Sequence, residues 1–295
     1  LAVHVLFVHQ NFPAQFAHLA PALAQRGHHV HALTIGGREL PGVELHRYKT
    51  SRGTSRQMHP WAAEFETKVI RGEAGARAAA QLKQQGFTPD LIVAHPGWGE
   101  DLFLKDVWPE ARLLAFVEFY YAAKGLDVGF DPEFDRSELM SHAKVRVKNA
   151  HLLLTLEAMD WGLSPTHWQK STVPAQYRDR ISVIFDGIDC GLVRPDPDAS
   201  STVRNKIIRA GDEVITFVSR NLEPYRGYHI FMRTLAEIQR RRPNAVTLIV
   251  GGDEVSYGAP APAGTTWKKK FLDEVADQID VKRVFFWEKS PTRTT

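Results

Sequence analysis

The stretch SRNLEPYRG, residues 219–227, holds residue types and a spacing that suit the binding of a phosphate group. Arg220 ends an apolar run, Arg226 follows six residues later, and Gly227 opens a helical pattern. Two guanidinium groups beside a helix N-terminus form a strong anion site, because their forked donors and the helix dipole both favour phosphate oxygens. The alternative is that both arginines are solvated residues of a surface loop.

A second loop, GGDE, follows the apolar run Val246–Val250. Gly251 and Gly252 allow a ligand to approach the backbone closely, and Asp253 adds a polar group beside them. A plain turn after a strand would have the same composition, and this alternative is favoured for the loop taken alone.

Polar residues also follow the apolar runs of the first half. His95 ends the run Leu91–His95, where it could donate a hydrogen bond to a sugar hydroxyl or to developing charge. Glu100 and Glu118 follow two of these runs and could serve as polar ligands. The alternatives are a structural or surface histidine, one of 13 in the chain, and carboxylates that begin a helix or face solvent.

These residues lie at the ends of short apolar runs that alternate with longer helical patterns. The alternation predicts an α/β fold with parallel sheets and helices on both faces, in which ligands bind beyond the carboxyl ends of the strands. The strands expected in the first half are Val3–His9, Val30–Ile35, Val43–Tyr48, Leu91–His95, Leu113–Phe119, Leu152–Leu156 and Ile181–Phe185. Ser164 and Pro165 are expected as the N-cap and first residue of the helix between the last two strands.

The composition changes at DGIDCGLVRPDPDASS, which is rich in Gly, Pro and Asp and is typical of a linker. It predicts two domains, residues 1–195 and 196–295. Three further strands are expected in the second domain, at Val214–Ser219, Val246–Val250 and Arg283–Phe286.

Composition narrows the class of protein. The 295 residues are 43% hydrophobic, enough for two domains with real cores, and the net charge of +3 is too small to indicate nucleic-acid binding. Cys190 is the only cysteine, which excludes an intrachain disulfide and a cysteine zinc site and fits a cytoplasmic setting. The basic tracts Arg240–Arg242 and Lys268–Lys270 are expected to be solvated helix faces, with contact to anionic lipid as the alternative.

Several motifs of other α/β enzymes do not occur. No G-x-G-x-x-G follows the first apolar run, which counts against an NAD-dependent dehydrogenase. Neither the P-loop pattern G-x-x-x-x-G-K-[ST] nor the hydrolase pattern G-x-S-x-G is found, so both of those classes are disfavoured.

Four segments together resemble the retaining glycosyltransferases of family 4, which have the GT-B fold. They are HVLFVHQNFPAQFAHLAPALAQRGHHVHALT, DLIVAHPGWGEDLFLKDVWP, GLSPTHWQKSTVPAQYRDRISVIFDGID and FVSRNLEPYRGYHIFMRTLAEIQRRRPNAVTLIVGGDEVSYG. The resemblance covers nearly the whole chain. It implies two Rossmann-like domains with doubly wound parallel sheets facing each other across a cleft, the first meeting the acceptor and the second holding a nucleotide-sugar.

The resemblance also implies roles for residues of the donor site. Arg220 and Arg226 stand at the positions of an arginine and a lysine that grip the donor diphosphate, and His95 matches a cleft histidine near the transferred sugar. The loop near the nucleotide is matched by Gly251, Gly252 and Asp253.

On the acceptor side, the resemblance points to the loops that follow strands of the first domain. Asn11 and Phe12 stand where glycines are usual, and Asp186 replaces the more common asparagine before a glycine. Glu118 is counted with these acceptor-side residues.

The implied mechanism needs no metal and no cofactor beyond the nucleotide-sugar. The diphosphate leaves, stabilised by Arg220, Arg226 and a helix N-terminus, and the acceptor hydroxyl attacks the same face of the sugar, so the anomeric configuration is retained. The expected partners are the nucleotide-sugar and a glycan or lipid-linked acceptor, with no nucleic acid. The expected location is the cytoplasm, with peripheral contact at the inner face of the membrane as an alternative.

The sequence departs from the family pattern at its end. Members continue with the rest of the second sheet and an acidic E-x7-E motif, so the second domain is expected to be incomplete. The tail Trp287–Thr295 is interpreted as a frameshift product, since a one-nucleotide shift in permissible codons relates it to a family-like peptide. Two alternatives to a transferase remain: a truncated, non-catalytic remnant that binds nucleotide weakly or acts only through a partner chain, and a nucleotide-sugar epimerase or dehydrogenase that binds NAD.

Overall fold

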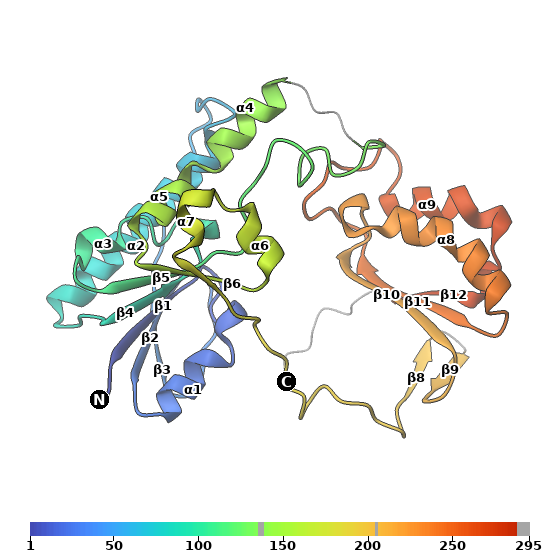
Figure 1. Ribbon diagram of the computed structural model, residues 1–295, viewed down its shortest axis with the longest axis horizontal. Coiled ribbons are helices and arrows are strands. Elements are labelled where there is room, and N and C mark those ends of the chain that lie inside the picture. Colours follow the sequence, from blue (N-terminus) through green and yellow to red (C-terminus); the bar gives the residue numbers. More distant parts are fainter. Residues whose placement is uncertain (135–138, 204–205, 288–295) are drawn as a thin grey trace. The chain divides into compact units, whose positions relative to one another are not determined.

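The computed structural model describes residues 1–134, 139–203 and 206–287 of the chain (Figure 1). The chain divides after Gly187 into two units, Leu1–Gly187 and Ile188–Thr295, and the described residues of each are compact.

The first unit is built on a seven-stranded parallel sheet with the strand order β3-β2-β1-β4-β5-β6-β7. The chain starts at the centre with β1, moves outward to β3, and then returns to β4 and builds the other half, so the topology reverses between β1 and β4. The strands are β1 His4–Val8, β2 His29–Thr34, β3 Val43–Arg47, β4 Leu91–Ala94, β5 Arg112–Phe116, β6 Trp161–Ser164 and β7 Ile181–Val183.

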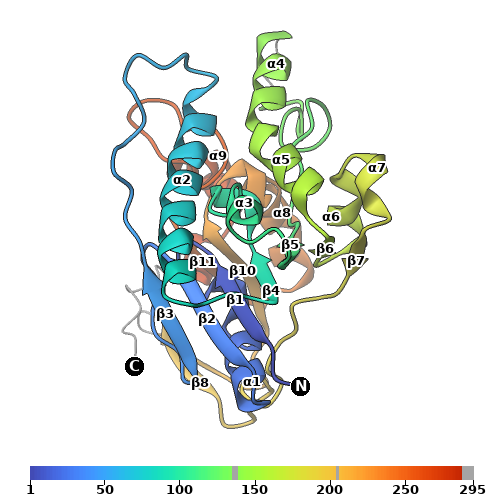
Figure 2. The ribbon, with the colours of Figure 1, turned by 90° about the vertical axis from the view of Figure 1, so that its left-hand side faces the viewer.

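Helices cover both faces of this sheet, as the sequence predicts. On one face lie helices α2 (Ala63–Gln84) and α5 (Ala150–Ala158) (Figure 2). Leu82 of α2 and Leu156 of α5 pack there with Leu6 and Leu33 of the sheet. On the other face, Ala20 of α1 lies in a second apolar cluster. The helices are α1 Leu19–Gln25, α2 Ala63–Gln84, α3 Leu104–Val107, α4 Leu139–Lys148, α5 Ala150–Ala158, α6 His167–Thr172 and α7 Ala175–Arg178, with short 3-10 turns η1 Ala14–Phe16 and η2 Pro96–Trp98.

The predicted strand Leu152–Leu156 is wrong, because these residues belong to helix α5. The buried positions of α5 are His151, Leu152, Thr155 and Leu156, which repeat at the spacing of one helical face. The segment is so apolar that its sequence shows neither a clear helical period nor a strand alternation, and periodicity alone cannot separate the two.

The strand of this region is β6 instead, and Ser164 is its last residue. The prediction of Ser164 as a helix N-cap is therefore wrong as well. Thr166 caps α6, because its hydroxyl accepts a hydrogen bond from the backbone N–H of Gln169 at 3.1 Å.

The second unit holds a three-stranded parallel sheet in the order β10-β11-β12, formed by Val214–Asn221, Val246–Gly252 and Val284–Trp287. Helices α8 (Tyr228–Arg241) and α9 (Trp267–Val275) pack on one face of the sheet. The Tyr228 ring lies 5.8 Å from Phe217 of β10 and 6.1 Å from Phe271 of α9. The 3-10 turns of this unit are η3 Pro224–Arg226, η4 Ala276–Gln278 and η5 Val281–Arg283.

The opposite face of this sheet meets an antiparallel hairpin, β8 (Ser200–Val203) and β9 (Lys206–Arg209), which the sequence pattern did not predict. Val203 and Ile208 of the hairpin pack with Val246 of β11. The hairpin therefore occupies the place that a helix takes in a doubly wound sheet.

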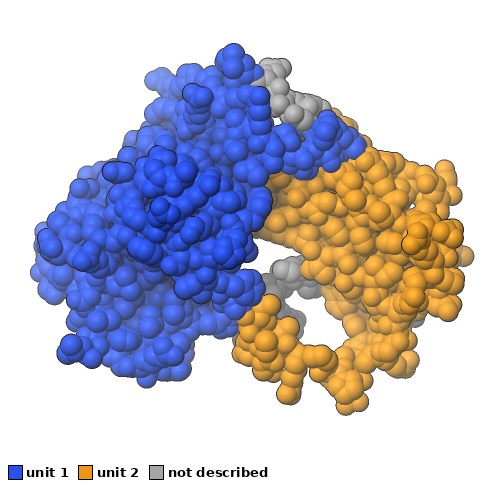
Figure 3. Space-filling model, viewed as in Figure 1, with its two compact units in different colours: residues 1–187 blue, residues 188–295 orange. Residues whose placement is uncertain are grey.

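An exposed segment joins β7 to β8 and so connects the two units, which Figure 3 shows in different colours. The predicted boundary after residue 195 lies in this segment, and so does Cys190, whose side chain is exposed and unpaired. The predicted frameshift tail concerns Trp287, which ends β12, and residues 288–295, which lie outside the described part. In the part of the chain that the structure describes, no helix is both long enough and apolar enough to span a bilayer.

Candidate functional site

Two histidines stand side by side where the topology of the first sheet reverses. His9 directly follows β1, His95 directly follows β4, and these two strands are paired. Their ring centroids are 5.3 Å apart, and both residues are buried. Ligands of open parallel sheets bind at such a reversal, beyond the carboxyl ends of the strands, so this pair marks the candidate site of the first unit.

The His95 imidazole is held by hydrogen bonds at both nitrogens. The backbone N–H of Gly97 donates to Nδ1 at 3.1 Å, and Nε2 lies 3.1 Å from Oε2 of Glu118. Because a backbone N–H can only donate, Nδ1 is the acceptor, and Nε2 carries the proton that it shares with the Glu118 carboxylate. The Phe116 ring stacks on the imidazole at 5.7 Å and fixes its plane.

Gly97 is required by the position of this ring. A Cβ atom at residue 97 would lie only 2.7 Å from Cε1 of His95, closer than a real contact. Any other residue would therefore push the imidazole away from Glu118.

Several pKa values around His9 and His95 differ from those of isolated side chains. The hydrogen bond from His95 lowers the pKa of Glu118, so this carboxylate, whose side chain is 51% exposed, stays ionised. Burial, with a smaller effect of His95, lowers the pKa of His9 to about 4, so His9 is neutral near pH 7. Burial and then the charge of Glu118 raise the pKa of Asp186, which follows β7.

The other residues predicted for this unit lie at the same edge or in the interior. The Asn11 side chain is exposed, and its backbone N–H donates to Nδ1 of His9 at 2.9 Å. The Phe12 side chain is buried in the core, so this residue could meet a ligand only through its backbone. Glu100 is buried too and accepts a hydrogen bond from the Tyr48 hydroxyl at 2.8 Å, which makes it an internal group rather than a ligand.

In the second unit, Arg220 lies at a β-bulge. Val218 pairs with Val250, but Asn221 pairs with Gly252, so β10 holds one extra residue between these two points. A bulge re-aims the side chains around it and is common beside functional sites. The Arg220 side chain is exposed, and in the described residues it has no carboxylate partner.

Arg226 lies on the same loop, two residues before Tyr228, the first residue of helix α8. Its guanidinium stacks on the Tyr257 ring, 4.9 Å from the ring centroid, and has no ion pair with a described carboxylate. Gly227 precedes the helix with a φ of 73°, and no side chain caps the first turn. The start of helix α8 and the two arginines therefore belong to one stretch of chain, which suits a phosphate group.

The carboxylate of Glu223 ties this loop to the one after β11. Glu223 is fully buried, and its oxygens accept hydrogen bonds from the backbone N–H groups of Ser256, Tyr257 and Gly258 at 3.1 to 3.4 Å. It thereby positions the ring on which Arg226 stacks. The role of Glu223 cannot be predicted from the sequence, because an acidic residue between two arginines is typical of a solvated ion pair.

The glycines predicted to let a nucleotide approach are explained by packing. A Cβ atom on Gly251 would lie 2.8 Å from Leu222, and one on Gly252 would lie 2.5 Å from the Asn221 side chain. Both glycines are thus needed where β11 meets the end of β10, whether or not a ligand binds. Asp253 is exposed beyond them, and its charge adds to the effect of burial in raising the pKa of Tyr228.

Comparison with known proteins adds the family context of these two sites. The family model described as "Glycosyl transferase family 4 group" matches residues 26–193. The D-inositol 3-phosphate glycosyltransferase of Segniliparus rotundus is 30% identical over 100 residues, which are 34% of this chain and 21% of that protein. The match thus spans about a fifth of the length of that relative.

Two solved structures are similar to this chain in fold. One is the catalytic domain of starch synthase IV from Arabidopsis thaliana, bound to ADP and acarbose, with a TM-score of 0.57, 13% identity, and coverage of 99% of this chain and 75% of that one. The other is a putative UDP-N-acetylglucosamine 2-epimerase from Listeria monocytogenes, with a TM-score of 0.51, 12% identity, and coverage of 98% and 70%. At these identities the likeness concerns the fold alone, and it confirms the predicted α/β GT-B fold.

Proposed function

The chain belongs to the glycosyl transferase family 4 group, and from this membership we propose that it acts in the transfer of a sugar from a nucleotide-sugar donor to an acceptor hydroxyl. The observation that carries the proposal is the pair of exposed guanidiniums, Arg220 and Arg226, beside the uncapped N-terminus of α8. Neither has a carboxylate partner in the described part of the chain, so both charges are available to an anion.

The second unit would bind the diphosphate of the donor. Arg220 and Arg226 would each offer paired N–H donors to phosphate oxygens, and the helix N-terminus would add its backbone N–H groups and dipole. The stacking of Arg226 on Tyr257 holds the guanidinium ready before the ligand arrives, which lowers the cost of ordering it on binding.

The first unit would bind a sugar through the His95 edge. Glu118 keeps the proton of His95 on Nε2, and the exposed part of its carboxylate can accept a hydrogen bond from a sugar or acceptor hydroxyl. His9, neutral and buried behind His95, leaves this edge without an additional positive charge.

In the proposed reaction, the bond between the sugar and the diphosphate breaks while the acceptor oxygen forms a bond to the same anomeric carbon. The electron pair of the broken bond leaves with the diphosphate, and Arg220 and Arg226 stabilise that charge. The acceptor proton passes to the leaving phosphate. We propose that transfer retains the anomeric configuration and needs no metal, since two guanidiniums supply the charge that a divalent cation would otherwise provide.

The test is a donor panel of UDP-, GDP- and ADP-sugars, with inositol phosphates among the acceptors because the relative from Segniliparus rotundus is named for one. Release of nucleoside diphosphate and the mass of the product report transfer. Arg220→Ala should weaken diphosphate binding by about 10- to 100-fold, the effect of losing a charged hydrogen bond.

Arg241→Ala is the matched control, because Arg241 is an equally exposed arginine at the far end of α8 that pairs with Glu237. It should bind nucleotide like the wild type. Equal nucleotide affinity of the wild type and Arg220→Ala would contradict the proposed donor site. Loss of activity after chelation, restored by added Mg²⁺, would contradict the metal-independent route. NAD binding without sugar transfer would favour the alternative reaction class.

A further inference from the structure

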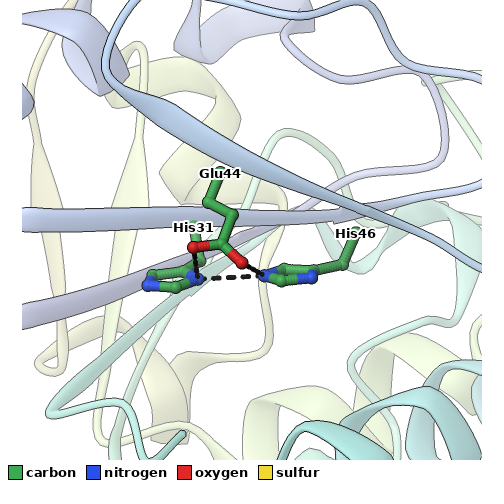
Figure 4. Close-up of side chains that lie close together, drawn as sticks. All are labelled: His31, Glu44 and His46. Carbon is green, nitrogen blue, oxygen red and sulfur yellow. Dashed lines mark hydrogen bonds and ion pairs between the residues drawn. The ribbon is translucent and has the colours of Figure 1, made fainter.

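Three side chains of metal-binding types converge on the sheet of the first unit, and none of them takes part in the function proposed above. His31 belongs to β2, and Glu44 and His46 belong to the edge strand β3 (Figure 4). Nδ1 of His31, a carboxylate oxygen of Glu44 and Nε2 of His46 all lie within 4.8 Å of one another. No other group of this kind occurs among the described residues.

The strand register brings these side chains together. His31 is the direct partner of Glu44, and Leu33 is the partner of His46. Since side chains alternate between the faces of a strand, Glu44 and His46 lie on the same face as His31. Two neighbouring strands thus present three ligand types toward one point.

The distances are close to those between ligands that share one ion. Nδ1 of His31 and Nε2 of His46 are 2.9 Å apart, and the carboxylate oxygens of Glu44 lie 3.7 Å and 3.6 Å from them. Two nitrogens about 2.1 Å from one ion stand about 3 Å apart at a right angle and about 3.4 Å apart at a tetrahedral angle. The oxygens of Glu44 lie a few tenths of an ångström farther from the nitrogens than this range. The Glu44 side chain is 67% exposed, so it is free to move closer.

Packing holds the two imidazoles in this orientation. Their planes differ by only 5°, and the Phe87 ring lies 4.1 Å from the ring of His31. A pocket of about 360 Å³, lined by His28, His29 and Glu44 among others, opens beside them and gives an ion access.

We propose that His31, Glu44 and His46 bind one divalent first-row transition ion, for which Zn²⁺ is the representative. Two imidazoles and one carboxylate match the ligands that Zn²⁺ takes in proteins, whereas Mg²⁺ and Ca²⁺ prefer oxygen ligands throughout. The proton now shared between the two nitrogens moves to the other nitrogen of its own ring when the ion enters, so both lone pairs become available. The remaining coordination positions are open to water.

The bound ion would clip the edge strand to the sheet. Glu44 and His46 lie on β3, which is hydrogen-bonded on one side only, and His31 lies on its neighbour β2. Coordination across the two strands adds a link where the ladder ends. The ion is therefore assigned a structural role in the first unit, independent of the nucleotide site of the second.

The test is calorimetric titration of the full chain with ZnCl₂ after removal of metals by chelation. We expect one saturable Zn²⁺ per chain and a rise in the unfolding temperature on binding. His46→Gln and Glu44→Gln should each weaken binding by at least about 10-fold, as losses in metal-site shells do. His59→Gln is the control, because His59 is exposed and lies in a different part of the first unit.

If His46→Gln disturbs the fold, Glu44→Gln still tests whether Zn²⁺ binds at this site. The Glu44 side chain is largely exposed, and glutamine has the same shape. Far-UV circular dichroism of both variants establishes that they are folded. Absence of saturable Zn²⁺ binding by the wild type overturns the proposal. Wild-type affinity in Glu44→Gln overturns it as well, because the ion would then be held elsewhere.

Discussion

The tautomer and orientation of the His95 imidazole are set by its immediate neighbours more than by its position after a strand. Gly97 fixes the acceptor nitrogen, Glu118 fixes the protonated one, and Phe116 fixes the ring plane. A histidine with both nitrogens engaged has one tautomer and one orientation. The role proposed for His95 therefore rests on three residues that surround it.

Replacing Gly97 by alanine should reduce sugar transfer nearly as much as replacing His95 itself. The new Cβ atom would stand 2.7 Å from Cε1 of His95 and displace the ring from Glu118. A loss of about 10-fold in kcat is expected, the effect of losing one positioned hydrogen bond to a charged group. Gly53→Ala is the control, since no atom lies within 4 Å of a Cβ at that position. Wild-type kcat in Gly97→Ala would rule out this dependence.

Buried neutral histidines should make the fold sensitive to acid. Burial lowers the pKa of His151 to about 4 from 6.5, and Nδ1 of this residue has no described hydrogen-bond partner. The unfolded chain therefore binds the proton first, and the free energy of unfolding falls as the pH drops from 6.5 toward 4. The loss from this one residue is about 3 kcal/mol over that window.

Urea unfolding at a series of pH values measures this effect. His151→Leu removes the titrating group with little change in side-chain volume, so its free energy of unfolding should fall less steeply with acid than that of the wild type. Parallel curves for the two proteins would mean that His151 does not titrate in this range.

At the scale of elements, a strand is predicted correctly from the sequence where a short apolar run has polar residues at both ends. Six of the seven strands of the first sheet coincide with predicted runs, because Gly, Pro and polar residues flank them. Helix α5 was missed since its run of leucines has no polar face. The hairpin of β8 and β9 was missed because its strands are short and mostly polar or exposed.

The residues of the candidate sites also divide into those that the sequence can predict and those that it cannot. Arg220, Arg226 and His95 could be selected from the sequence, because charged or titratable residues directly follow apolar runs. The contributions of Glu223 and His9 could not, because they arise from burial and from loops that meet only in the folded chain.

Glu223 should be the residue on which the donor loop depends most. Glu223→Ala leaves the backbone N–H groups of Ser256, Tyr257 and Gly258 without their acceptor, which should lower the free energy of unfolding by about 1–3 kcal/mol. Nucleotide affinity should fall too, because Tyr257 no longer holds Arg226. Glu223→Gln keeps one acceptor oxygen and should lie between. Unfolding and nucleotide titrations that leave Glu223→Ala equal to the wild type would refute this role.

At the scale of the whole molecule, the chain forms two compact units whose sheets are covered by different elements. The first sheet is covered by helices on both faces, and the second by helices on one face and a hairpin on the other. The first unit carries the His95 edge and the proposed Zn²⁺ site, and the second unit carries the proposed diphosphate site. A ligand that binds only the native form stabilises it by about 2.7 kcal/mol at a hundredfold excess over Kd.

Two ligands should therefore leave two separate footprints in hydrogen exchange. A nucleoside diphosphate should slow exchange in the loops 219–231 and 251–258, and Zn²⁺ should slow it in β2 and β3. Arg220→Ala should erase the first footprint only, and Glu44→Gln the second only. Slower exchange of β2 and β3 with nucleotide alone would contradict the independence of the sites.

The single exposed thiol between β7 and β8 makes the connection between the units easy to observe. A maleimide dye reacts once per chain at Cys190 without any engineered substitution, since the sequence has no other cysteine. Fluorescence anisotropy of that dye then follows the local motion of the connecting segment. The same labelled sample can be titrated first with nucleotide and then with Zn²⁺, so that one probe reports how each ligand affects the tether.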